Sequence, residues 1–142
     1  MPILLDHIIV PSHDQAGQAQ FLGELLGVPW KKEQGHFSPV FVNDTLTLDF
    51  GNADDFPVQH YCFHVSNEEF DAIFDRVKAA GLVYGSAPWT TTDMQINTHL
   101  GGRGVYWQDP VDHHMWEMLT VSYARPDVVI ADNVASFSDS SR

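Results

Sequence analysis

The sequence has only one cysteine, few basic residues and no long apolar run. Because Cys62 is alone, the chain can form neither an internal disulfide nor a cluster of thiolates around a metal, which indicates a reducing compartment. Seven basic residues against nineteen acidic ones give a formal net charge of −12, so a polyanion such as nucleic acid would be repelled. No apolar stretch approaches the length of a membrane span, and residues 1–10 lack the features of a signal peptide. We therefore expect a cytoplasmic protein that binds neither nucleic acid nor membranes.

One order of predicted elements occurs twice along the 142 residues. Residues 3–10 are rich in β-branched side chains and predict a strand that ends at Pro11. Residues 37–42 and 46–50 predict two more strands, and a further short one is expected around 30–33. The same order returns in strands predicted at 58–65, 105–108 and 115–120.

Each copy also contains a helix with matching ends. Ser12 with Gln15, and Ser66 with Glu69, have the spacing of a capping box, in which a serine and a glutamate or glutamine satisfy the first backbone N–H groups of a helix. Apolar residues at helical spacing follow both serines. The glycines predicted to end the two helices are Gly27 and Gly81.

This pattern predicts an α+β fold with two paired βαβββ modules, at about 3–50 and 58–120, that form a cupped, open β-barrel-like sheet. Each module leaves one face of a small sheet uncovered, so we expect the two to form a single domain over residues 1–120. Residues 121–142 contain Pro126 and a serine-rich end, which indicates a partly mobile tail, anchored by an apolar patch at 128–130.

Four polar residues occupy equivalent places in the two copies. His7 and His60 lie in the first strand of each copy, and Asp49 and Glu117 lie in the last strand, flanked by large apolar residues. A carboxylate inside the stretch 115–119 would be costly to bury unpaired, so Glu117 needs a cation or a strong donor. A metal ion is one such partner, because two neutral imidazoles and one carboxylate suit zinc, iron(II), manganese or nickel.

The sequence resembles the vicinal oxygen chelate superfamily, which includes glyoxalases, ring-cleaving dioxygenases, fosfomycin-resistance enzymes and bleomycin-binding proteins. The resemblance covers roughly residues 3–120. It implies that paired βαβββ modules hold a metal ion, which chelates neighbouring oxygens of a substrate. The stretches that carry it are Leu5–Val10, Gln59–Val65, and Gly104–Pro110 continuing to Met115–Leu119.

The resemblance also implies roles for the four polar residues. His7, His60 and Glu117 map onto the ligand positions of one divalent metal ion. Asp49 maps onto a fourth position, where glyoxalases carry glutamate, and its shorter side chain leaves three roles open: a ligand, a base, or a partner through water. Glu117 and Asp49 are the expected catalytic carboxylates.

Four further residues are candidates for the wall of a substrate pocket. His64 shares a strand face with His60, although a histidine near a helix cap has an ordinary structural explanation. His99 and Arg103 flank a flexible pair of glycines that could close over a ligand, or form a plain surface loop. Trp107 could line a pocket, but aromatic residues of small barrels also form their cores.

The sequence leaves three activities open for a small-molecule substrate. The metal could assist glyoxalase-type isomerisation or ring cleavage by iron(II), and the favoured interpretation is an enzyme. The alternative is a drug- or metabolite-binding protein of the bleomycin-resistance kind, which would have no chemical reason to keep three buried polar ligand positions. Because modules of this superfamily pair within one chain or across two, we expect a homodimer.

Overall fold

A computed structural model describes residues 3–132 of the chain. The chain divides into two compact units, which are described separately below. Unit 1 comprises Met1–Val58 and Pro110–Asp112, and unit 2 comprises Gln59–Asp109 and His113–Arg142. The part of the predicted tail at 133–142 lies outside the described residues.

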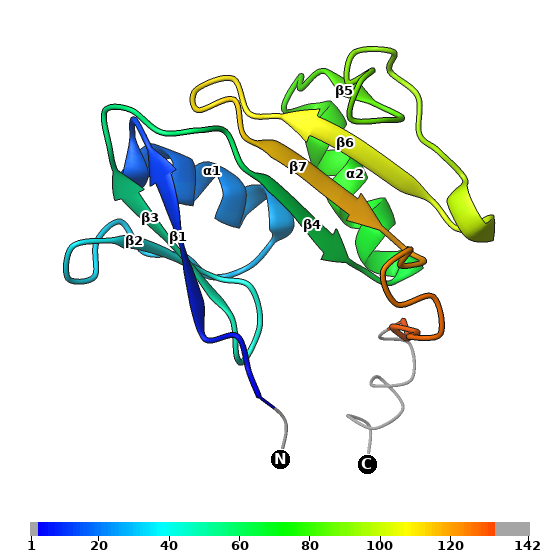
Figure 1. Ribbon diagram of the computed structural model, residues 1–142, viewed down its shortest axis with the longest axis horizontal. Coiled ribbons are helices and arrows are strands. Elements are labelled where there is room, and N and C mark those ends of the chain that lie inside the picture. Colours follow the sequence, from blue (N-terminus) through cyan, green and yellow to red (C-terminus); the bar gives the residue numbers. More distant parts are fainter. Residues whose placement is uncertain (1–2, 133–142) are drawn as a thin grey trace. The chain divides into compact units, whose positions relative to one another are not determined.

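Unit 1 contains a small mixed sheet with one helix across it (Figure 1). Strands β1 (His7–Ser12), β2 (Ser38–Phe41) and β3 (Thr47–Asn52) lie in the order β1-β3-β2, with β1 parallel and β2 antiparallel to β3. Helix α1 (Gln15–Leu26) packs against this sheet. The apolar core of unit 1 consists of Val10, Ala19, Leu22, Leu25, Val40, Leu48 and Phe50.

The start of α1 differs from the prediction. Asp14 caps the helix, because its carboxylate accepts a hydrogen bond from the backbone N–H of Gly17 at 3.1 Å. Ser12 instead ends β1, and its hydroxyl accepts a hydrogen bond from the N–H of Asp14 at 3.0 Å. Gln15 exchanges hydrogen bonds with Asn52 at the end of β3. The predicted capping box at Ser12 is therefore wrong, since the strand runs on through the serine.

The limits of β1 also differ from those predicted. Its partner β3 begins at Thr47, opposite His7, so the ladder starts at His7 rather than at Ile3. The strand then continues through Pro11, because β1 is an edge strand and a proline there removes no hydrogen bond from the sheet. The strand expected around 30–33 is reduced to a single bridge between Trp30 and Val40.

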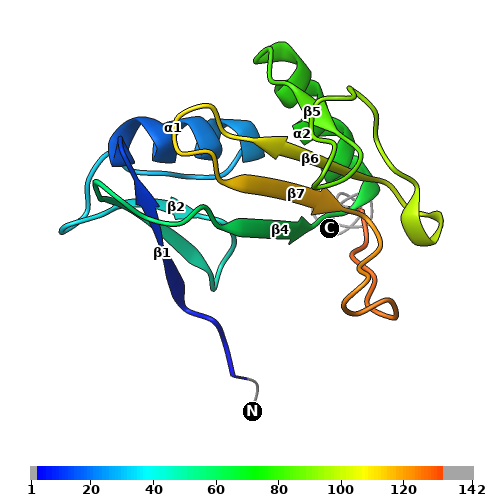
Figure 2. The same ribbon diagram turned by 45° about the horizontal axis from the view of Figure 1, so that its top comes forward.

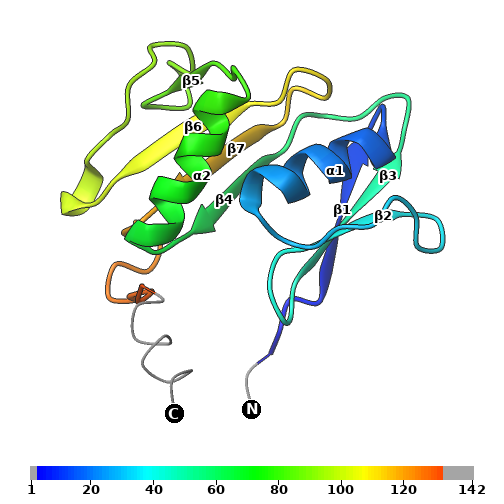
Figure 3. The same ribbon diagram turned by 180° about the vertical axis from the view of Figure 1, so that it is seen from behind.

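Unit 2 repeats this plan with one more strand. Strands β4 (His60–His64), β5 (Tyr84–Gly85), β6 (Gly104–Gln108) and β7 (Met115–Leu119) lie in the order β4-β7-β6-β5, with β4 parallel to β7. Figure 2 shows β4, β7 and β6 side by side, and Figure 3 shows helix α2 (Asn67–Ala79) lying across their sheet. A short 3-10 turn, η1 (His99–Gly101), precedes β6. The core includes Val65, Phe70, Ile73, Val77, Val105, Trp107, Trp116 and Met118.

Helix ends in the repeat largely follow the sequence pattern. The capping box of α2 is confirmed: Ser66 accepts a hydrogen bond from the N–H of Glu69 at 3.1 Å, and the Glu69 carboxylate accepts one from the N–H of Ser66 at 2.8 Å. Gly27 ends α1 in the left-handed conformation, as predicted. Helix α2 ends at Ala79, and Gly81 follows with a φ of 70°.

The α+β class and the two modules of βαβββ type are confirmed by this order of elements. The two-residue strand β5 was not predicted, because it is too short to show alternation. The union of both modules in one domain with a cupped sheet stays a prediction. In residues 3–132, no helix is both long enough and apolar enough to cross a membrane.

Removing either helix cap tests the two helix starts that the structure assigns. We expect Ser66→Ala and Asp14→Ala each to lower the free energy of unfolding by about 1 kcal/mol, because the first backbone N–H groups of the helix lose their acceptor. Chemical denaturation measures this change. Replacement of the exposed Thr92 by alanine is the control and should leave stability within about 0.5 kcal/mol. An Asp14→Ala variant as stable as the wild type would contradict the assignment of this cap.

Candidate functional site

One face of the sheet in unit 2 packs on α2, and the other carries polar residues. Side chains alternate along a strand, so Glu117 points away from the face on which its neighbours Trp116 and Met118 are buried. Cys62 of β4 and Tyr106 of β6 pair directly with Glu117 and share its face. The alternation also places His60 and His64 on this face, which we call the open face of unit 2.

A histidine and a carboxylate meet on the open face. His60 Nε2 donates a hydrogen bond to Glu117 Oε1 at 2.9 Å, and the two side chains form an ion pair when His60 is protonated. The Glu117 side chain is only 2% exposed, whereas that of His60 is 45% exposed. A carboxylate buried to this degree depends on donors fixed by the protein, because water reaches it poorly.

Two hydroxyls and a thiol surround the same carboxylate. The Tyr123 hydroxyl donates a hydrogen bond to Glu117 Oε1 at 2.9 Å. Partial burial and this bond raise the pKa of Tyr123 to about 12. Burial, and then the Glu117 charge, raise the pKa of Cys62 to about 12 and hold the pKa of Tyr106 well above its usual value. Each of these groups would add a second negative charge beside Glu117 if it ionised, so they stay neutral.

Unit 1 repeats the geometry of the histidine and the carboxylate. His7 is the first residue of β1 and pairs with Thr47, and Asp49 follows two residues later along β3. In unit 2, His60 is the first residue of β4 and pairs with Met115, and Glu117 again follows two residues later. Because paired residues share a face, His7 and Asp49 lie on one face of their sheet, as His60 and Glu117 do on theirs.

The surroundings of His7 leave one ring nitrogen for another partner. Its Nδ1 hydrogen-bonds the Asp6 carboxylate at 2.9 Å, which fixes the tautomer that has its lone pair on Nε2. The bond to Asp6, and then the negative charges of Asp6 and Asp49, raise the pKa of His7. The side chain is 52% exposed, so the ring is accessible. This arrangement is typical of a metal-binding histidine, whose second nitrogen is held by a carboxylate.

The donor set in unit 2 fits two ligands of one metal ion. Adjacent ligands of an octahedral ion with bonds of about 2.1 Å lie roughly 3 Å apart, and His60 Nε2 and Glu117 Oε1 are separated by 2.9 Å. Imidazole nitrogen and carboxylate oxygen both suit a first-row divalent metal. Throughout the described part of the chain, no three His, Cys, Asp or Glu side chains come together as a complete ligand set. The structure therefore brings together two of the three residues that the sequence predicts as ligands.

Two of the predicted pocket residues lie outside this cluster, and one borders it. His64 lies on the open face with His60, and its Nε2 donates to the backbone carbonyl of Thr120 at 3.1 Å. His99 is exposed in η1. Trp107 is 1% exposed and pairs with Trp116 on the face that packs on α2, so it belongs to the core and not to the open face.

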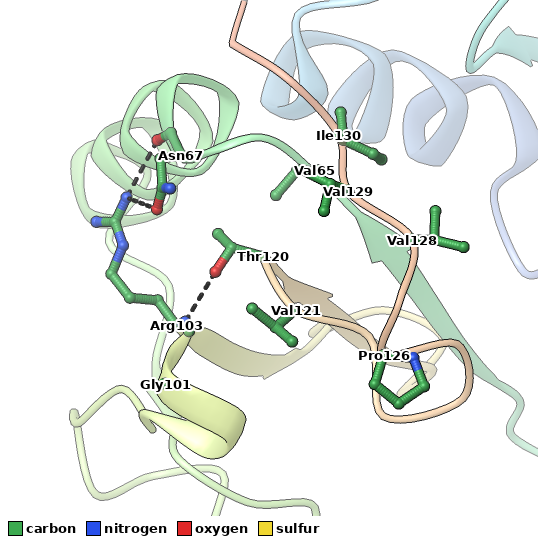
Figure 4. Close-up of a pocket in the computed structure, with 11 residues that line it drawn as sticks. Val65, Asn67, Gly101, Arg103, Thr120, Val121, Pro126, Val128, Val129 and Ile130 are labelled. Atoms are coloured by element: carbon green, nitrogen blue, oxygen red, sulfur yellow. Dashed lines mark hydrogen bonds between the residues drawn. The ribbon is translucent and has the colours of Figure 1, made fainter.

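Arg103 is engaged with α2. Its guanidinium donates to the Asp71 carboxylate at 2.7 Å and to the carbonyl and side-chain oxygens of Asn67 at 3.1 Å, and it lies over the ring of Phe70. It also borders a cavity of about 400 Å³, together with Thr120, Val65, Val121 and Ile130 (Figure 4). These bonds hold the guanidinium against α2, where Arg103 stabilises unit 2, and its role in a substrate pocket stays a prediction.

Three residues of the cluster were not predicted from the sequence. Cys62 lies two residues after His60, so strand alternation alone would have placed it on the open face. Tyr106 required the register between β6 and β7, which the sequence does not reveal. Tyr123 lies in the segment that was predicted to be a tail, and no periodicity there indicates that it would reach Glu117.

Comparisons with known proteins found no matching family model and no matching curated protein. Among solved structures, the chain is 39% identical to oxidase ChaP-H2 (TM-score 0.81), with 87% of this chain and 97% of that chain covered. It is 41% identical to oxidase ChaP-H1 (TM-score 0.80), with 86% and 98% covered. It also matches the fosfomycin resistance protein FosX of Listeria monocytogenes, solved with Mn(II) and a dihydroxypropylphosphonic acid, at 20% identity and a TM-score of 0.65, with 89% and 96% covered. The match to FosX shows the shared glyoxalase-type fold alone.

The neighbourhood of Cys62 predicts an unreactive thiol. Alkylation requires the thiolate, and with a pKa of about 12 roughly one thiol in ten thousand is ionised at pH 8, against about a quarter at an ordinary pKa. We expect iodoacetamide to label the metal-free native protein at least about a hundredfold more slowly than the same chain in urea. Glu117→Gln should accelerate labelling of the native protein, because it removes the neighbouring charge. Equal rates for native and unfolded protein would contradict this account of the site.

Proposed function

The chain belongs to the vicinal oxygen chelate superfamily, in the family of oxidases ChaP-H1 and ChaP-H2, and from this membership we propose that it is a metal-dependent enzyme that oxidises a small organic molecule. About two residues in five are identical to both oxidases, over nearly their whole length. This similarity supports the assignment of the chain as an enzyme and favours oxidation over isomerisation. The chemistry of the site has to be argued from the residues of this chain.

The buried pair of His60 and Glu117 is the observation on which the metal proposal rests. We assign these two residues and His7 as the ligands of one divalent ion. Their spacing of 2.9 Å supports adjacent positions on one ion, and the bond from His7 to Asp6 supports Nε2 of His7 as the third donor. Asp49 is a fourth ligand or a base. The homodimer stays a prediction.

A divalent ion held there supplies a Lewis acid that can bind neighbouring oxygens of a substrate and stabilise developing negative charge. The carboxylates of the chain do the proton chemistry. Asp49 lies on the same sheet face as His7, is only partly buried and can accept a proton from a substrate hydroxyl. The side chain of His64 on the open face can orient the substrate by a hydrogen bond. Neutral Tyr106, which is buried, limits water around Glu117 on that face.

Oxidation and isomerisation differ in their demand for dioxygen. Cleavage of a catechol ring inserts both atoms of one O₂ into one substrate molecule, and no other oxidant is needed. Isomerisation of a hemithioacetal to a thioester moves hydrogen within the substrate and consumes no O₂. The relationship to two oxidases supports a reaction of this chain that consumes O₂.

Loss of metal on removal of a ligand tests the metal proposal. We expect the purified protein to contain one divalent ion per proposed site and His60→Ala, Glu117→Ala and His7→Ala to lose most of it, because each removes a donor. Elemental analysis measures the metal content, and circular dichroism checks that each variant is folded. His99→Ala, which removes an exposed histidine of η1, is the control and should keep its metal. Unchanged metal content in all three ligand variants would refute the assignment.

Oxygen uptake tests the reaction class. With iron(II), manganese(II) or zinc loaded in turn, we expect at least one metal form to consume O₂ in the presence of catechols or other phenols, and Glu117→Ala to abolish the uptake. A Clark electrode and mass spectrometry with ¹⁸O₂ measure uptake and incorporation. Thioester formation from hemithioacetals without O₂ uptake would assign an isomerase instead. Tight binding of substrates with neither reaction would assign a binding protein.

A further inference from the structure

Tyr123 reaches the predicted metal ligand from outside the sheet. It lies beyond the end of β7, in the segment that Figure 2 shows leaving that strand, yet its hydroxyl donates to Oε1 of Glu117 at 2.9 Å. The residue as a whole is 55% exposed, so its ring is not held there by burial in the core. The hydrogen bond to Glu117 therefore ties Tyr123 to the open face, where its hydroxyl also interacts with Cys62 and Tyr106.

The backbone around Tyr123 is fixed on both sides. Before it, Thr120 and Arg103 exchange hydrogen bonds: the N–H of Thr120 donates to the Arg103 carbonyl, and the hydroxyl of Thr120 accepts from the N–H of Arg103, both at 2.9 Å. At the turn itself, the Ser122 hydroxyl accepts from the N–H groups of Ala124 and Arg125 at 3.1 and 2.9 Å. A tyrosine between two such anchors is presented in a defined position.

Two donors converge on one oxygen of Glu117, and metal binding affects them differently. His60 Nε2 and the Tyr123 hydroxyl both donate to Oε1 at 2.9 Å. An imidazole nitrogen binds a metal only in its deprotonated form, so His60 cannot donate to Glu117 and hold the ion through Nε2 at the same time. The Tyr123 hydroxyl is not needed as a ligand and keeps its proton. It is therefore a donor to Oε1 that persists when the ion is bound.

We propose that Tyr123 is a positioning residue, whose hydroxyl holds the Glu117 carboxylate in the orientation in which Glu117 and His60 share one divalent metal ion. The proposal rests on the metal site of the proposed function. It assigns a role in the site to the segment after β7, which the sequence pattern predicted to be only a tail.

Burial of Glu117 makes this single hydroxyl important. The Glu117 side chain is 2% exposed, so water cannot easily replace a missing donor. Tyr106 and Cys62 also hydrogen-bond Glu117, but without the Tyr123 hydroxyl the oxygen Oε1 loses a donor that helps to fix the orientation of the carboxylate. Loss of a hydrogen-bond partner of a metal ligand typically weakens metal affinity by about 10- to 100-fold.

The test compares two tyrosines of unit 2 that differ in their contact with Glu117. Tyr123→Phe removes only the hydroxyl, and Tyr84→Phe is the matched control, because the Tyr84 ring contacts Phe74 on the side of α2. Titration of the metal-free full chain with Co²⁺ gives the affinity, and the visible absorption bands of bound Co²⁺ report the geometry of its ligands. We expect Tyr123→Phe to weaken Co²⁺ binding by about tenfold or more and to change these bands, and Tyr84→Phe to do neither.

Thermal unfolding of the metal-free variants separates positioning from general stability. We expect Tyr123→Phe and Tyr84→Phe to unfold at similar temperatures, so that a loss of affinity confined to Tyr123→Phe supports positioning. Co²⁺ binding by Tyr123→Phe equal to that of wild type would overturn this proposal and leave the metal site standing. A Tyr123→Phe variant in which only the KM for substrate changes would also overturn this proposal and leave the metal site standing. Tyr123 would then be assigned to substrate contact. Failure of the wild-type protein to bind Co²⁺ would overturn both proposals, because Glu117 would then have no ion to hold.

Discussion

The burial of the Glu117 carboxylate is the constraint on which the open face of unit 2 depends. The Glu117 side chain lies in the middle of a strand and is only 2% exposed, so hydrogen-bond donors of the protein have to replace those that water would supply. His60 from the parallel neighbour and Tyr123 from the following segment supply them at 2.9 Å. Cys62 and Tyr106, paired with Glu117 across the sheet, complete a shell of neutral groups. Packing alone would favour an apolar residue here, so the burial of Glu117 depends on these donors.

Parallel pairing between the first and last strand of each module explains why the same chemistry appears twice. Each first strand begins with a histidine, whose partner on the last strand lies two residues before an acidic side chain. His7 pairs with Thr47, two residues before Asp49, and His60 pairs with Met115, two residues before Glu117. The two pairs then share a face because side chains alternate. The βαβββ order makes this pairing possible, since the helix carries the chain over to the far side of the sheet before the last strand returns beside the first.

Elements with a strong period or cap could be predicted from the sequence. The capping box at Ser66, the glycine at Gly27 and the repeat of strands all reflect local chemistry that the residues themselves specify. The errors have physical causes as well. Ser12 has the right spacing for a cap, but pairing with β3 draws it into a strand. Tyr123 could not be found, because its contact with Glu117 depends on the path of an irregular segment and not on any local pattern.

The two modules resemble each other in register but not in their contacts. Glu117 is long enough to meet His60 directly, whereas His7 makes its hydrogen bond with the exposed Asp6 and interacts with Asp49 through charge alone. Asp49 is one methylene shorter than Glu117 and is only partly buried. Unit 2 therefore holds a preassembled pair of an imidazole and a carboxylate, whereas unit 1 holds an imidazole oriented by a neighbouring carboxylate. Asp49 is only partly buried whereas the Glu117 side chain is 2% exposed, so in the proposed site Asp49 is the better placed of the two carboxylates to exchange protons with water or substrate.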